Sequence, residues 1–269
     1  MKAISLVATP RLAKFFDNLT GNEAILYQLV RQQLILRYRR TFFGYLWTLF
    51  NPLLMMSVTA VVFSTIFQLD LKTYAIFLFS GMVAFQFFAT CSAQSGQSLL
   101  GNEQLIKKIY VTKLLFPLSV SFALLIDSIL MASSLFIIIL AIGGKITWAI
   151  LFIPLSYLLI YGFSFGLGLI LSVASVFFRD LQHIIAIVMQ ALLFLSPVFY
   201  KPESLAGKVK VLIELNPLTH YIELFRAPIY NGDLPSMTTV LMAALYSCIS
   251  LALGIYVFRK LENRVAFRL

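Results

Sequence analysis

Long apolar runs alternate with short basic segments along almost the whole chain. One run, residues 114–144, is interrupted only by Asp127. Five others contain no Asp, Glu, Lys or Arg: residues 41–69, 73–102, 146–178, 181–200 and 234–258. A helix needs about 20 apolar residues to cross the hydrocarbon core of a bilayer. The pattern therefore predicts an all-α integral membrane protein with six transmembrane helices. The run at 146–178 is too short for two crossings, and its residues before Pro154 are expected to be interfacial.

The segment before the first span is predicted to form an amphipathic helix over residues 23–40. Thr20-Gly-Asn-Glu23 has the spacing of a capping box, which starts a helix. Apolar residues then recur at helical spacing, opposite a polar face, as in a helix lying in a membrane surface. The helix ends in a basic cluster, Arg37, Arg39 and Arg40. It is either a plain basic anchor or a docking surface for a cytoplasmic partner.

A second short helix is predicted over residues 101–110, between the second and third spans. Glu103 lies near its start and Lys107 and Lys108 near its end, as the helix dipole favours. A solvated loop is the alternative. Its apolar residues Leu105, Ile106 and Ile109 favour contact with a partner.

The connection at residues 201–236 contains two apolar pieces too short to cross, 209–215 and 218–229. They are predicted to be short re-entrant or interfacial helices. Asn216-Pro217 supplies an N-cap and a first-turn proline for the second piece, and Pro228 limits its end. Glu223 and Arg226 are three residues apart and could pair. The segment is either a rigid lid or a gate beside a pathway.

Composition excludes a soluble fold. The 269 residues are 60% apolar and only 12% charged, and the mean hydropathy is +0.91. The formal net charge is +10. Placing the connections alternately on two sides puts most Lys and Arg residues on the side of both termini, which predicts cytoplasmic N- and C-termini. The high basicity therefore suits anionic lipid headgroups rather than nucleic acid.

Some apolar spans carry residues with possible chemistry. Asp127 is the one carboxylate deep in a predicted span, where it serves either helix packing or a transport pathway. Aromatic residues make up 14% of the chain, and their faces can stack on sugar rings. Candidates for lining a substrate channel are Asp127 with Tyr74, Phe77, Phe85, Phe88, Phe199 and Tyr200.

Catalytic and metal-binding patterns are missing from the sequence. Gly143-Gly-Lys145 is followed by Ile146, so it does not complete a phosphate-binding loop. No cluster of acids, histidines and cysteines has metal-ligand spacing, and no metal site is expected. The chain is therefore not expected to be an enzyme.

Five segments, in order, resemble the membrane subunits of bacterial polysaccharide ABC exporters, especially O-antigen permeases. They are residues 39–53 (RRTFFGYLWTLFNPL), 102–108 (NEQLIKK) with Phe116-Pro117, 176–181 (VFFRDL), 196–200 (SPVFY) and 216–218 (NPL). The pair Val111-Thr112 departs from the Phe-Pro that this pattern favours. The likeness covers nearly the whole chain.

The resemblance implies a homodimeric permease in the bacterial inner membrane that translocates undecaprenyl-linked polysaccharide, such as O antigen. ATP and Mg²⁺ would be bound by two copies of a cytoplasmic ABC ATPase, and this chain would bind no cofactor. The first and fifth spans would form a lateral opening for the lipid anchor. The resemblance implies ATPase contacts at Arg31, Arg37, Arg39, Arg40, Asn102, Glu103, Lys107 and Lys108. It implies a periplasmic gate that includes Asn216, Pro217, Glu223 and Arg226.

The expected organisation has a cytoplasmic N-terminal segment (1–40), a transmembrane domain (41–258) with gate helices within 201–236, and a cytoplasmic tail (259–269). Two alternatives stay open: an exporter of a small molecule or drug with the same architecture, and an ATP-independent channel or carrier that uses Asp127.

Overall fold

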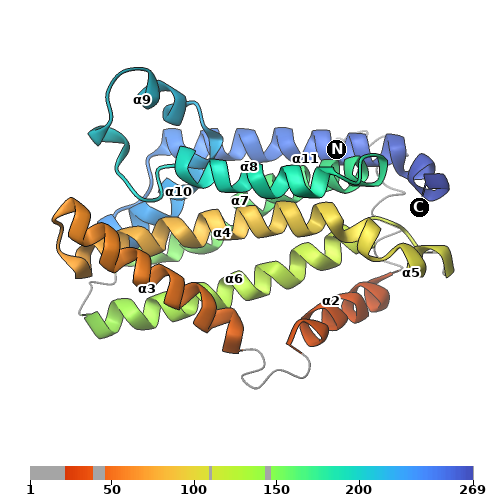
Figure 1. The fold of residues 1–269 in the computed structure, drawn as a ribbon, viewed down its shortest axis with the longest axis horizontal. Helices are drawn as coiled ribbons and strands as arrows, with labels where there is room; N and C mark the ends of the chain where they lie inside the picture. Colours follow the sequence, from red (N-terminus) through yellow and green to blue (C-terminus); the bar gives the residue numbers. More distant parts are fainter. Residues whose placement is uncertain (1–21, 39–45, 109–110, 143–146, 269) are drawn as a thin grey trace, which may run out of the picture.

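A computed structural model describes residues 22–38, 46–108, 111–142 and 147–268. Within these ranges all regular elements are helical and there is no strand, which confirms the all-α prediction. The long helices lie side by side along one direction, and α3 crosses them obliquely (Figure 1). The elements in chain order are α2 (Glu23–Tyr38), α3 (Trp47–Phe67), α4 (Leu71–Gly101), α5 (Glu103–Lys108), α6 (Leu115–Ile142), η2 (Trp148–Phe152), α7 (Ile153–Phe177), α8 (Leu181–Leu195), η3 (Pro202–Ser204), α9 (Gly207–Glu214), α10 (Pro217–Arg226), η4 (Ala227–Asn231) and α11 (Met237–Arg268).

Four helical segments of the described chain are long and apolar enough to cross a membrane: Leu71–Gly101, Leu115–Leu140, Trp148–Phe177 and Met237–Glu262. The other two predicted spans contain shorter apolar helices, Leu53–Phe67 and Leu181–Leu195. The third of the long segments includes the 3-10 helix η2, which corresponds to the interfacial lead-in expected before Pro154. The structure thus supports four crossings by length, and the count of six stays a prediction.

The two ends of the bundle carry different elements. The helices α2 and α5 and the C-terminal part of α11 lie at one end, which we call the α5 end (Figure 1). The helices α9 and α10 lie at the opposite end, which we call the α10 end. The two ends are therefore suited to different contacts.

The centre of the bundle is formed by α4 and α7, which bury larger shares of their apolar windows than α6 and α11 do. Small residues bring α7 very close to α11. A Cβ atom on Gly166 would lie 2.4 Å from the Ser250 carbonyl carbon, and one on Gly254 would lie 2.4 Å from the Gly166 oxygen. Ser250 Oγ donates a 2.8 Å hydrogen bond to the Phe163 carbonyl. Such close approach of small residues is a common basis for helix association in membranes.

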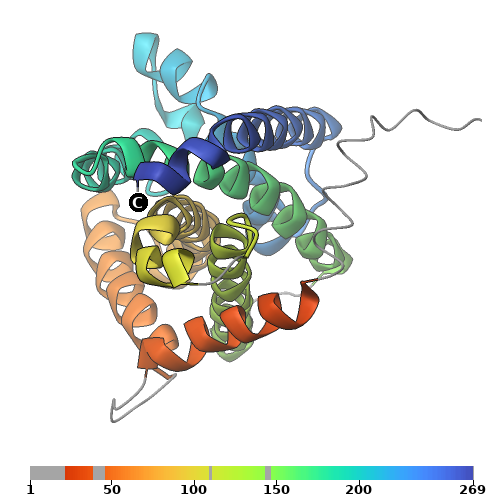
Figure 2. The same cartoon turned by 90° about the vertical axis from the view of Figure 1, so that its right-hand side faces the viewer.

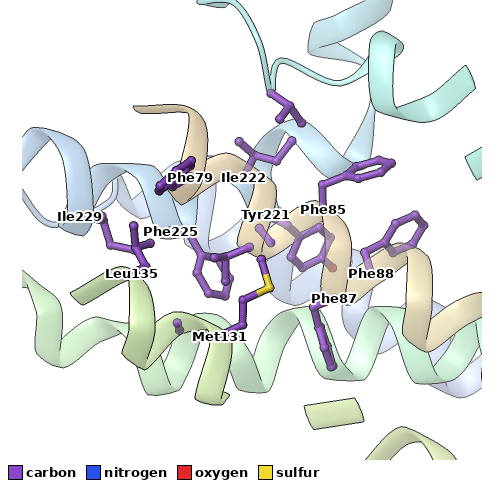
Figure 3. Packing of buried hydrophobic residues seen from close by; sticks show 14 of the residues in the cluster. Phe79, Phe85, Phe87, Phe88, Met131, Leu135, Tyr221, Ile222, Phe225 and Ile229 are labelled. Atoms are coloured by element: carbon purple, nitrogen blue, oxygen red, sulfur yellow. The ribbon is translucent and has the colours of Figure 1, made fainter. Parts of the chain in front are cut away.

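An aromatic core joins α4, α6, α7 and α10 (Figure 3). The rings of Phe163 and Tyr221 stack with their centroids 4.9 Å apart, and Tyr157 meets Phe225 edge-on at 4.9 Å. Because both contacts reach α10, the short helix is a packed part of the bundle.

A second apolar cluster lies at the α5 end. Leu29 of α2 is buried against it, together with Leu99, Leu115 and Phe116. Ile35 and Leu36, farther along α2, are exposed. The helix predicted over residues 23–40 is confirmed over Glu23–Tyr38, and it packs against α6 by one face.

Candidate functional site

The helix α10 begins as its sequence predicts. Asn216 Oδ1 accepts a 3.0 Å hydrogen bond from the Leu218 amide, and Pro217 occupies the first turn. Asn216 Nδ2 also donates to Ser196 Oγ (3.0 Å) and to the Leu195 carbonyl (3.2 Å). The N-cap therefore fastens the start of α10 to the end of α8 as well as capping the helix.

Arg226 fastens the other end of α10. Its side chain is 4% exposed, and Nη2 donates to the carbonyls of Pro197 (2.8 Å) and Val198 (3.2 Å). The guanidinium carbon lies 3.8 Å from the ring centroid of Phe77 in α4, a cation–π contact. A Cβ atom on Gly81 would lie 2.8 Å from the same Nη2. Gly81 thus provides the space that the guanidinium fills.

The two charged side chains of α10, Glu223 and Arg226, are partly shielded from solvent. Burial lowers the pKa of Arg226 to about 10, with Glu223 opposing that shift. Burial also raises the pKa of Glu223, against the attraction of Arg226. The two residues therefore attract each other, as their spacing suggests, while the hydrogen bonds of the guanidinium go to backbone carbonyls.

A pocket of about 420 Å³ opens at the α10 end, and we call it the aromatic pocket. It lies where the end of α3, the start of α4, the residues after α8, and Tyr230 of η4 meet. Six of its ten lining residues are aromatic. The lining residues are Phe67, Leu69, Asp70, Thr73, Tyr74, Phe77, Phe199, Tyr200, Lys201 and Tyr230.

Several polar groups of the pocket walls are engaged in contacts with the rest of the chain. Tyr74 Oη donates to the Phe199 carbonyl (2.9 Å), and Tyr200 Oη donates to the Phe194 carbonyl (2.7 Å). Asp70 caps α4 by accepting from the Thr73 amide at 2.9 Å, and this bond lowers the pKa of Asp70. Lys201 Nζ lies 5.5 Å from the Tyr230 ring centroid. Phe67 is exposed and Tyr200 and Tyr230 are partly exposed, whereas Tyr74, Phe77 and Phe199 are buried within the walls. The accessible rings, with an acid and a base among them, suit sugar rings.

The residues predicted to line a substrate channel do not all meet in this pocket. Four line it, namely Tyr74, Phe77, Phe199 and Tyr200. Phe85 and Phe88 are buried in the core, where Phe88 stacks on Phe163 at 5.5 Å. Asp127 is half-buried on α6 and does not line the pocket.

The predicted partner-contact residues gather at the α5 end as far as the structure describes them. Glu103, Lys107 and Lys108 belong to α5, and Lys107 pairs with Glu103 at 2.6 Å, which lowers the pKa of Glu103. Asn102 precedes α5, and its Nδ2 donates to the Ser98 carbonyl at 2.7 Å.

The rest of this predicted set lies on α2 or beyond it. Arg31 is exposed on α2, Arg37 lies in the same helix, and Arg39 and Arg40 lie outside the described residues.

The apolar side chains of α5 are covered within the chain itself, as far as the structure describes them. Leu105 and Ile106 pack partly buried against the chain's own apolar cluster, so they need no second protein to cover them. Ile109 lies outside the described residues. The exposed groups of α5 are its charged and polar side chains.

Sequence reasoning missed Gly81, Gly166 and Tyr230. The glycines 162 and 166 are four residues apart, which is a spacing typical of helix contacts in membranes and was available in the sequence. Gly81 and Tyr230 gave no such signal because their roles depend on residues far away in the chain.

Comparison with known proteins agrees with this architecture. Residues 25–230 match the family described as ABC-2 type transporter. The chain is 26% identical to the O-antigen export system permease protein RfbA of Myxococcus xanthus, over 90% of this chain and 94% of that protein. It is 27% identical to the protein of the same name from Klebsiella pneumoniae, over 90% and 93%. It is 25% identical to the polysialic acid transport protein KpsM of Escherichia coli, over 86% and 93%.

Proposed function

The chain belongs to the ABC-2 type transporter family, and from this membership we propose that it is the permease subunit of an ATP-driven exporter of lipid-linked polysaccharide such as O antigen. The observation that carries the proposal is the nearly end-to-end similarity to permeases named for O-antigen export and polysialic acid transport. A similarity of this extent includes the α10 segment and α5, not the spans alone.

The proposed topology has six crossings, with the α5 end in the cytoplasm and the α10 end at the periplasm. Basic residues support this orientation because cytoplasmic segments are enriched in Lys and Arg. At the α5 end the described connections carry Lys107, Lys108, Lys113 and Arg179. In this arrangement α9 and α10 flank the exit side of a transport path.

The proposed energy source is a cytoplasmic ABC ATPase that binds ATP and Mg²⁺ and contacts the α5 end. Two permease copies would enclose the path between them. The exposed apolar side chains of α3 and α8 support this, since such faces are covered either by lipid or by another apolar surface.

The aromatic pocket is the proposed contact site for the sugar rings of the polymer at the exit side. The accessible rings of Phe67, Tyr200 and Tyr230 would stack on the apolar faces of sugars. Asp70 and Lys201, also in the lining, would bond sugar hydroxyl groups. This role requires the pocket to face the path in the assembled exporter.

Deletion of the gene tests the proposal. Loss of the permease should leave completed lipid-linked polymer inside the cell and remove it from the surface. The measurement is surface labelling of the polymer compared with its amount in whole-cell extracts. Restoration by a plasmid copy is the control, and unchanged surface polymer in a clean deletion would contradict the proposal.

The two alternatives are separated by reconstitution. Purified permease and ATPase together should show ATP hydrolysis that responds to lipid-linked polymer. Stimulation by a non-carbohydrate would favour a small-molecule exporter, and transport by the permease alone would favour a self-sufficient carrier.

A further inference from the structure

The C-terminal part of α11 continues as a strongly basic helix beyond its apolar stretch. Residues 259–268 contain four basic side chains and one acid, a net charge of +3. Of these, Lys260, Arg264 and Arg268 are exposed. The family match covers residues 25–230, so this segment lies outside the matched region.

This segment is fixed to the bundle and is not a loose tail. Phe258 and Val265 are fully buried in the apolar cluster at the α5 end. Lys113 Nζ, from the connection between α5 and α6, donates a 3.0 Å hydrogen bond to the Glu262 carbonyl. The guanidinium of Arg268 lies 4.9 Å from the ring centroid of Phe177, the last residue of α7.

These contacts place the end of α11 beside α5. Both views show the C-terminus next to that short helix, and the view along the bundle shows the end of α11 turned over the bundle's end (Figure 2). Arg179 belongs to the same region, because it follows by two residues Phe177, the ring that Arg268 contacts. We call the resulting set the basic end surface: Lys107, Lys108, Arg179, Lys260, Arg264 and Arg268.

We infer that residues 259–268 form part of the docking surface for an acidic face of the cytoplasmic ATPase subunit, extending the contact beyond α5. The inference rests on the proposed function. Complementary charge increases the rate of association and selects the partner, and it acts at the rim of an interface. A protein is the better occupant than lipid because the segment lies across the end of the bundle, whereas headgroups surround the bundle at its sides.

The test uses the full-length permease co-expressed with its ATPase and purified through a tag on the permease. The double variant Lys260→Glu/Arg264→Glu reverses two exposed charges that take no part in the contact with Lys113. It should reduce the ATPase retained at about 150 mM salt several-fold, and its difference from the parent should shrink as salt rises because exposed charges are screened. The variant Lys208→Glu/Lys210→Glu, with the same charge change on α9, is the matched control and should retain ATPase normally.

The other outcomes distinguish this inference from the function on which it rests. If Lys107→Glu/Lys108→Glu loses the ATPase while Lys260→Glu/Arg264→Glu keeps it, the α11 inference is wrong and the proposed function stands. If the unaltered permease retains no ATPase, the proposed function itself fails. If Lys260→Glu/Arg264→Glu keeps the ATPase but loses co-purified phosphatidylglycerol, the segment binds lipid headgroups and the inference is overturned.

Discussion

Arg226 connects three parts of the chain through a single side chain. Its guanidinium bonds the carbonyls of Pro197 and Val198 and lies over the ring of Phe77. Arginine suits this position because its planar group can stack and donate several bonds at once, which the point charge of lysine cannot do. Removing it would leave two buried carbonyls without these donors.

Arg226→Ala is therefore expected to lower the free energy of unfolding by about 2 kcal/mol or more. Gly81→Ala should also destabilise, since its new methyl group would lie against a guanidinium that is held in place. The double variant should be no less stable than Arg226→Ala alone, because the clash disappears with the arginine. Thermal unfolding in detergent measures all three, and Gly101→Ala is the control because no other group would lie within 4 Å of the added methyl. Strict additivity of the two changes would contradict this account.

Glu223 gives a prediction about pH. Burial raises its pKa above the ordinary carboxyl value of 4.5. A carboxyl whose pKa is raised in the folded state stabilises the fold at low pH, where it is protonated. This contribution to stability is lost as the pH rises through the pKa that the carboxyl has in the folded protein. Glu223→Gln should therefore be more stable than the parent protein at neutral pH, with the difference vanishing below about pH 4.5. Stability differences measured between pH 4 and 8 that do not change with pH would exclude this explanation.

Individual residues were predictable only where their partners are close in sequence. Asn216-Pro217 could be identified because an N-cap acts on amides two or three residues away. Arg226 was recognised as a charged residue of the predicted gate, but its main contacts, Phe77 and Pro197, lie far away in the chain. Burial of Phe85 and Phe88 in the core likewise depends on packing that composition does not reveal.

The pairing of α7 with α11 shows how little space separates two helices of this bundle. Gly254 faces Gly166, while Ala252 on the same helix is exposed. Gly254→Leu should push the helices apart and lower both stability and export. Ala252→Leu adds the same kind of side chain toward lipid and should be tolerated. Expression, thermal unfolding and surface polymer are measured for both variants. Equal stability and equal export of the two variants would mean that the close contact between α7 and α11 does not stabilise the protein.

The attachment of α2 rests on one deeply buried side chain. Leu29→Ala removes apolar contacts with the α5-end cluster. It should lower the free energy that holds α2 against the bundle by about 2 kcal/mol or more. Faster protease cleavage near residues 23–38 is the expected result. Ile35→Ala, at an exposed position of the same helix, should leave the cleavage rate unchanged.

Helices were largely predictable from apolar runs, and their ends were less so. The predicted pieces 209–215 and 218–229 correspond to α9 (Gly207–Glu214) and α10 (Pro217–Arg226). The end of α11 was missed as helix because its charges mark the end of an apolar run, although helical hydrogen bonding continues to Arg268. Charge marks where a span leaves the apolar layer, which is a different boundary from the end of a helix.

At the scale of the whole molecule, orientation is the property with the widest consequences. Each end of the bundle carries an exposed lysine that can be replaced for labelling. Lys72 lies at the α10 end and Lys108 at the α5 end. Of the native cysteines, Cys91 is buried and Cys248 is exposed on α11, so Cys248→Ser gives a suitable background for labelling.

In that background, Lys72→Cys should react with a membrane-impermeant thiol reagent in spheroplasts, and Lys108→Cys should react only after the membrane is opened. The physical reason is that charged reagents do not cross the hydrocarbon layer. The parent Cys248→Ser protein is the control for background labelling. The reverse pattern would invert the topology and move the proposed ATPase contacts to the wrong side.

One continuous helix, α11, takes part in contacts near both ends of the bundle. Near the α10 end, Tyr221 Oη of α10 donates a 2.8 Å hydrogen bond to the Ala243 carbonyl of α11. Near the α5 end, Val265 of α11 is buried in the second apolar cluster. About 33 Å of unbroken helix separates these two contacts. A force on the basic end of this helix would be carried toward α10 along its backbone hydrogen bonds. Mechanical linkage between the proposed ATPase contact and the α10 end would then run through a single backbone, without a chain of intermediate side-chain rearrangements.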